Sequence, residues 1–109
     1  MNIKVTLESN LKFDIADIEK EIQKELEESA YEIEKESKRL CPVDTGYLRS
    51  SIGTEVSDLE VNIGTDVYYA GYVHDGTYRM EARPFLDSAA DTVLEDIEDR
   101  IADAIERSI

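Results

Sequence analysis

The sequence predicts an α+β domain in which an antiparallel sheet of about four strands carries a long helix from the N-terminal half and a C-terminal helix on one face. Two observations support this class. Apolar residues recur every three or four positions in residues 14–40 and 84–109, and every second position in most of the rest. The alternating segments are joined too closely for parallel crossovers, so hairpin connections are expected. A chain of 109 residues fits one domain, here 1–109, with a modest core.

The N-terminal part predicts a strand followed by a long helix. Within residues 1–13, apolar side chains alternate with polar ones at Ile3, Val5 and Leu7. Asp14 suits the N-cap of the helix, with an acid three residues later, and Pro42 ends it. The helical stripe, interrupted by Ser37, consists of Ile15, Ile18, Ile22, Leu26, Ala30, Ile33 and Leu40.

The middle of the chain predicts three further strands. Alternation over Leu48–Val56 gives one strand, and a turn near Ser57–Asp58 leads into another over Leu59–Ile63. Residues 64–66 break that strand, and Val67–Val73 reads as an aromatic-rich strand. We therefore expect an antiparallel meander.

The C-terminal part predicts a loop and one last helix. Gly76 opens a loop over residues 77–83, and Pro84 suits the first turn of a helix. Asp87 and Asp91 favour the positive end of the helix dipole. The apolar stripe consists of Leu86, Ala90, Val93, Leu94, Ile97, Ile101, Ile105 and Ile109.

The net charge of −14 narrows the range of partners. Acids outnumber bases 26 to 12, with 10 against 5 in residues 14–40 and 8 against 2 in residues 85–109. Tight binding of nucleic acid or an anionic membrane needs clustered Lys and Arg, so neither is expected. No apolar run is long enough to span a bilayer and the N-terminus alternates, so an intracellular soluble protein is expected.

Catalytic and metal-binding patterns are weak. Cys41 and His74 are the sole residues of their types, so we expect no intrachain disulfide, no metal site and no cofactor. No phosphate-binding glycine loop is present. Tyr68, Tyr69 and Tyr72 lack basic neighbours, so they are expected to fill the sheet core or an interface.

The triplet Asp44-Thr45-Gly46 admits two interpretations. In a dimeric aspartic protease of the retroviral type, two such aspartates share a proton. Here the triplet follows a helix and Pro42, and about half of the chain is predicted helical, whereas such proteases are nearly all sheet. A tight turn, in which Gly46 supplies a positive φ, is the favoured interpretation. A small acidic regulator of a basic partner is a third possibility, supported by the charge alone.

Two segments carry a family resemblance. The first holds Pro42, Asp44, Thr45, Gly46, Leu48, Ser51 and Ile52, and the second holds Tyr69, Ala70, Tyr72, Val73, Gly76 and Thr77, followed by Met80, Ala82, Pro84, Phe85 and Leu86. In this order and spacing they resemble the tail-completion, or head–tail joining, family of tailed bacteriophages. The chain departs from that family's pattern at His74, where Glu is usual, and at Asp75, where an aromatic residue is usual.

The resemblance implies a non-enzymatic assembly role. Similar proteins form a ring, commonly of six subunits, between a head-side connector and tail-tube proteins, and DNA passes through without specific binding. It also implies a virion protein that is assembled in the host cytoplasm, with no membrane or small-molecule ligand. The residues expected to contact neighbours are Asp44, Thr45, Gly46, Tyr72, His74, Asp75, Gly76, Thr77, Met80, Arg83 and Phe85.

Overall fold

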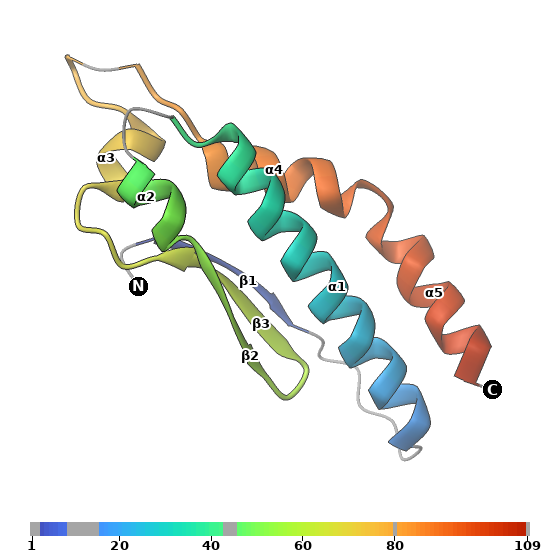
Figure 1. Ribbon diagram of the computed structural model, residues 1–109. Helices are drawn as coiled ribbons and strands as arrows, with labels where there is room; N and C mark the ends of the chain where they lie inside the picture. The colour runs from blue at the N-terminus through green and yellow to red at the C-terminus, as the bar shows by residue number, and fades with distance from the viewer. Residues whose placement is uncertain (1–2, 9–15, 43–45, 80, 109) are drawn as a thin grey trace.

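The computed structural model describes residues 3–8, 16–42, 46–79 and 81–108, and its elements form an elongated molecule of 53 × 22 × 21 Å (Figure 1). In chain order the elements are β1 (Ile3–Glu8), α1 (Ala16–Leu40), α2 (Gly46–Ser51), β2 (Gly53–Ser57), β3 (Glu60–Thr65), α3 (Ala70–Asp75), α4 (Phe85–Val93), the 3-10 helix η1 (Leu94–Asp96) and α5 (Ile97–Ser108). This is the α+β class that the sequence predicts.

The sheet has three strands in the described part of the chain, in the order β1-β3-β2, and both pairings are antiparallel. On the central strand, Val61 and Ile63 are fully buried and face Leu7 and Val5 of β1 in register. The alternate residues of β1, Lys4, Thr6 and Glu8, are exposed, as expected for a sheet with one face on the core and one in water. The prediction of about four strands is therefore wrong by one.

The strand predicted over Leu48–Val56 is only half correct, because its first part is the short helix α2. Leu48 and Ile52 are both buried, at 0% and 2% exposure. Apolar residues four apart satisfy a helical period as well as an alternating one, so this short stretch is ambiguous in sequence. The hydroxyl of Ser51 bonds to the Leu48 carbonyl at 2.6 Å and to the Thr65 hydroxyl at 2.6 Å, which ties the helix to β3.

The aromatic strand predicted over Val67–Val73 is wrong, because these residues form a turn and the start of α3. Ala70 and His74 are the buried residues of α3, and their spacing of four is helical. The β2–β3 hairpin turns at Asp58–Leu59, next to the predicted position, and Leu59 has a φ of 54°. The Gln23 side chain accepts the Leu59 N–H at 2.6 Å and donates to the Ser57 carbonyl at 3.1 Å, which holds this turn against α1.

Helix α1 is the central element of the core. Its predicted stripe is confirmed from Ile18 to Ile33, whereas Ile15 lies outside the described residues. Ser37, predicted to interrupt the stripe, is also fully buried, and the helix ends at Leu40 as Pro42 predicts. The proposed N-cap Asp14 lies outside the described residues. α1 packs on β3 and also along α4 and α5, and Figure 1 shows it running between the sheet and these C-terminal helices.

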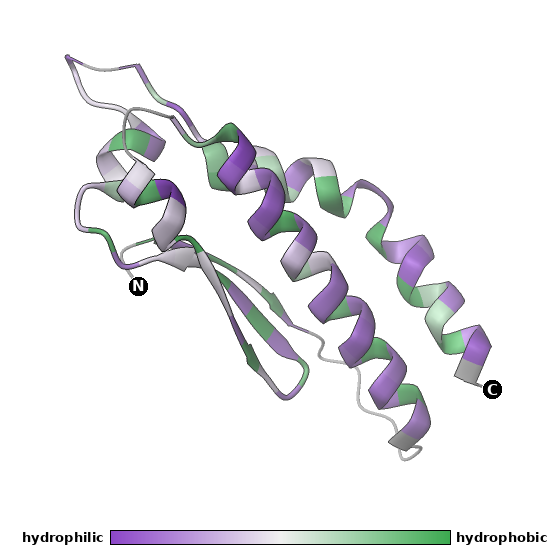
Figure 2. Cartoon of the chain, in the orientation of Figure 1, coloured by the Kyte–Doolittle hydropathy of each residue, from purple (hydrophilic) through white to green (hydrophobic). Residues whose placement is uncertain are grey.

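The predicted C-terminal helix is interrupted. Pro84 precedes α4 as expected, but residues 94–96 form η1 before the helix resumes as α5. Figure 2 shows hydrophilic residues over much of α1 and α5. Among the described helices, none is both long enough and apolar enough to cross a membrane.

Candidate interaction surface at the tyrosine end

Exposed tyrosines gather at one end of the molecule. We call this the tyrosine end and define it as α2, residues 66–69, α3 and the loop of residues 76–84, which lie together where α1 ends, opposite the C-terminal end of α5 (Figure 1). Four of the six exposed large hydrophobic side chains in the described residues belong to it: Tyr47 (71%), Tyr68 (81%), Tyr72 (61%) and Tyr78 (91%). A gathering of exposed aromatic rings of this kind is typical of a protein–protein contact.

Helix α3 determines which way Tyr72 faces. Tyr72 projects outward because Ala70 and His74 occupy the buried side of this short helix. Gly76 ends it with a φ of 79°, and its N–H donates to the Tyr72 carbonyl at 2.9 Å. A left-handed residue after a helix favours Gly, so this position explains the glycine.

His74 fastens the tyrosine end to α4. Its ring is 6% exposed and meets the Phe85 ring edge-on, with centroids 5.4 Å apart. Nε2 accepts the backbone N–H of Asp87 at 3.3 Å, which leaves the proton on Nδ1, 2.9 Å from an Asp75 carboxylate oxygen. Of the expected contact residues, His74 and Phe85 are therefore buried anchors, and Asp75 lies exposed beside them.

The described residues of the loop, 76–79 and 81–84, project beyond α3 (Figure 1). The Arg83 N–H donates to the Val73 carbonyl at 3.0 Å, and the Arg79 N–H donates to the Thr77 hydroxyl at 3.2 Å. The Arg79 guanidinium lies 5.2 Å from the centre of the Tyr78 ring, a cation–π distance. Among the expected residues, Thr77 and Arg83 are exposed here, whereas Met80 lies outside the described part.

A shallow hollow of about 370 Å³ adjoins this loop and is lined by Tyr68, Gly71, Tyr72, Asp75 and Gly76. Three of these five residues are among the expected contact residues: Tyr72, Asp75 and Gly76. The structure therefore places the second sequence segment around one surface. It adds Tyr78 and Arg79, which no sequence pattern indicated, and it shows that Tyr68, expected in the sheet core or an interface, is exposed there.

The first segment is described only in part, because Asp44 and Thr45 lie outside the described residues. Gly46 is the first residue of α2 and has no positive φ, so the positive φ predicted for it is wrong; the rest of the predicted turn lies outside the described residues. The helices α1 and α2 flank the triplet, ending at Leu40 and beginning at Gly46. An aspartic protease needs this triplet at the end of a β-strand, and the flanking helices disfavour that alternative.

Cys41 and Arg49 connect α1 to α2. Cys41 is 2% exposed, and an Arg49 Nη2–H donates to its carbonyl at 3.3 Å. Burial raises the pKa of the Cys41 thiol, and the positive charge of Arg49 partly offsets this effect. A neutral buried thiol is a poor nucleophile and a poor metal ligand. In the described part of the chain, no group of three or more potential metal ligands lies together.

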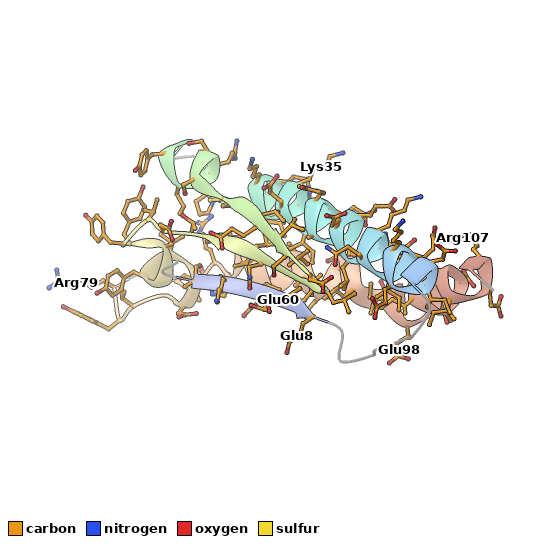
Figure 3. All side chains as sticks on the ribbon, turned by 90° about the horizontal axis from the view of Figure 1, so that it is seen from below. Glu8, Lys35, Glu60, Arg79, Glu98 and Arg107 are labelled. Atoms are coloured by element: carbon orange, nitrogen blue, oxygen red, sulfur yellow. The ribbon has the colours of Figure 1, made fainter. Side chains whose placement is uncertain are left out.

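Charge is distributed unevenly along the molecule. Residues 35–49, which lead into the tyrosine end, hold four bases and two acids, whereas residues 85–109 hold eight acids and two bases. Figure 3 shows Arg79 at one end and Glu98 towards the other. Both bases of α5 are paired with α1: Arg100 with Glu25 and Glu32, and Arg107 with Glu21 and Glu25.

One protein-family model matches this chain. The model of the family described as "Bacteriophage HK97-gp10, putative tail-component" matches residues 6–76, which is more than half of the chain and includes the elements from α1 to α3. No curated protein and no solved structure matches it. The chain therefore belongs to the HK97-gp10-like family of bacteriophage tail components.

Proposed function

We propose that this chain is a non-enzymatic structural protein of a phage or prophage virion that joins head and tail as a subunit of a ring around the DNA passage. Membership of a tail-component family supports the virion as its location. Assembly in the host cytoplasm is part of the proposal. In this proposal residues 1–109 act as one domain, and the ring, a hexamer as in similar proteins, meets a head-side connector protein on one side and tail-tube proteins on the other.

The observation that carries the proposal, beside the family match, is the tyrosine end. Four tyrosines exposed by 61% to 91% are costly to leave in water, and Tyr and Arg are enriched at the energetic centres of protein interfaces. Rings of identical subunits need two different contact surfaces on each subunit. An elongated chain with an aromatic end and an acidic remainder supplies two such surfaces.

The acidic surface suits a protein that surrounds DNA without holding it. With 26 acids against 12 bases, the chain repels phosphates at short range, and solvent ions screen this repulsion beyond about 8 Å at physiological salt. A ring with this charge would let the genome pass without specific binding. The same charge would also support a small acidic regulator of a basic partner, but that alternative gives no role to the exposed tyrosines.

The test is deletion of the gene from the phage or prophage that encodes the chain, followed by electron microscopy of the lysate. We expect filled heads and separate finished tails, because each would assemble without the joining ring. Normal infectious particles would overturn the proposal, and heads without any tails would assign the chain to tail building instead. Complementation by Asp44→Asn separates the protease alternative, because a protease would lose all activity and a joining protein would still restore infectivity.

A further inference from the structure

We propose that the tyrosine end docks on the acidic α4–η1–α5 surface of a second copy of this chain, with Tyr78 and Arg79 at the centre of the contact. This inference deepens the proposed function and rests on it, since it names the two surfaces through which neighbouring subunits would meet. The contact is heterologous, with one end of a subunit against the side of the next, and such contacts form a ring where the rotation between neighbours closes.

The tyrosine end is large enough for this role. Its four exposed rings together equal about three fully exposed tyrosines, or roughly 600 Å² at about 200 Å² each. A standard interface takes about 800 Å² from each partner. Arg79, Arg83 and the exposed backbone of the loop would supply the remaining area.

The acidic surface offers a matching recess. A hollow of about 340 Å³ lies where η1 meets α5, and it is lined by residues 94–99, which comprise four carboxylates and the half-buried Leu94 and Ile97. The stacked pair of Tyr78 and Arg79 has the complementary chemistry. A guanidinium binds a carboxylate with two parallel hydrogen bonds, and the ring can cover aliphatic carbons.

The distribution of charge favours a second copy of this chain as the partner on the acidic surface. It also favours contact through the tyrosine end of that copy. Contact between the acidic surfaces of two copies would bring like charges together, which disfavours that arrangement. The tyrosine end is neutral overall, with three arginines against Asp66, Asp75 and Glu81, so its contact with the acidic surface avoids this repulsion. In the proposed orientation Arg79 and Arg83 of the loop lie against carboxylates. Within α5, Arg100 and Arg107 are directed to acids of α1, so the recess offers mainly negative charge to a neighbour.

The experiment measures the association of the full-length chain by sedimentation velocity, at low salt and up to its solubility limit. Four variants are compared with the wild type. They are the loop reversal Arg79→Glu/Arg83→Glu, the recess reversal Glu98→Arg/Asp99→Arg, the combination of all four changes, and a control with the same charge change on the exposed face of α1, Lys20→Glu/Lys24→Glu. Circular dichroism and thermal melting establish that each variant is folded.

We expect either reversal to weaken association by about 100-fold, and the combined variant to recover most of it because opposite charges face each other again. The control should associate like the wild type, and about 1 M NaCl should weaken the wild-type contact. If the loop reversal associates normally, or if the combined variant does not recover, the inference fails while a ring built through other surfaces remains. If the wild type stays monomeric in every condition, the inference also fails, and the gene deletion decides the proposed function separately.

Discussion

Arg100 is the residue whose removal best tests how two acidic helices pack together. Helix α1 carries nine acids against five bases, and residues 85–108 carry eight acids against two bases, yet α5 lies along α1. The Arg100 side chain, 21% exposed, lies between them, with Nε 3.4 Å from a Glu25 oxygen and Nη1 3.1 Å from a Glu32 oxygen. Arg100→Met keeps much of the aliphatic volume and removes the charge.

The loss of stability expected for Arg100→Met follows from the burial of Glu25. The Glu25 side chain is only 9% exposed, so without Arg100 it keeps one partner, Arg107, which is itself 53% exposed. Burial disfavours the charged form of Arg100, but its hydrogen bond to Glu32 and the nearby acids outweigh this and raise its pKa. A charge-assisted pair of this kind contributes about 2 kcal/mol, which corresponds to a fall in Tm of roughly 10 °C.

The assay is thermal melting with hydrogen exchange of the α5 amides, and Arg39→Met serves as the matched control. Arg39 pairs with Glu36 on the exposed face of α1, so its removal changes the net charge equally but should leave Tm nearly unchanged. The Arg100→Met protein should also lose protection in α5 first. Its deficit should shrink in about 1 M NaCl, where repulsion between the helices is screened.

Two results would refute this reasoning. If Arg39→Met lowered Tm as much as Arg100→Met, the loss of stability would come from the change in net charge, and not from the ion pairs between α1 and α5. If Arg100→Met melted like the wild type, apolar contacts such as that of Ala104, which is fully buried, would suffice to dock α5.

Three further predictions concern the sheet, the hairpin and pH. Gly64→Ala should destabilise the protein by about 1–3 kcal/mol in thermal melts, since a Cβ there would lie 2.2 Å from a carbonyl oxygen of β1, whereas Gly53→Ala, with its nearest atom at 3.9 Å, should be mild. Gln23→Ala should cost about 1–2 kcal/mol in urea unfolding, since it removes both bonds to the turn at Leu59. Burial raises the pKa of Cys41 above its ordinary value of 9.0, so the unfolded thiol ionises first and stability should fall as pH rises above that value; Cys41→Ala should reduce this fall.

Each of these predictions has a contradicting result. Equal melting temperatures for Gly64→Ala and Gly53→Ala would mean that β1 moves away from β3 without loss. An unchanged urea midpoint for Gln23→Ala would mean that solvent replaces the amide at the turn. Identical alkaline profiles of the wild type and Cys41→Ala would assign the fall in stability to other groups.

The elements that the sequence predicted well are those with long periodic patterns. The long helical period of α1 and the alternation of β1 each fit one type of secondary structure, because every further residue that follows a period makes the other period less compatible with the sequence. The break at η1 left no clear sign in the sequence, since residues 86–105 keep a helical stripe through it. The packing of two acidic helices was also hidden, because it depends on pairs such as Arg107 and Glu21, which are 86 positions apart.

The predictions of the short elements were wrong for a reason that bears on function. A strand over residues 67–73 would have directed alternate tyrosines into the core, so the sequence pattern was compatible both with a place in the core and with a place in an interface. The buried pair of Ala70 and His74, four residues apart, and the helix-ending Gly76 were the signals for α3. Because these residues form a turn and a helix, Tyr68 and Tyr72 face water, while the ring of His74 fixes the whole segment to α4. The change from strand to helix therefore creates the tyrosine end, and the bond from Asp87 to His74, with the contact of its ring on Phe85, holds this loop-rich segment in the fixed shape that a contact surface requires.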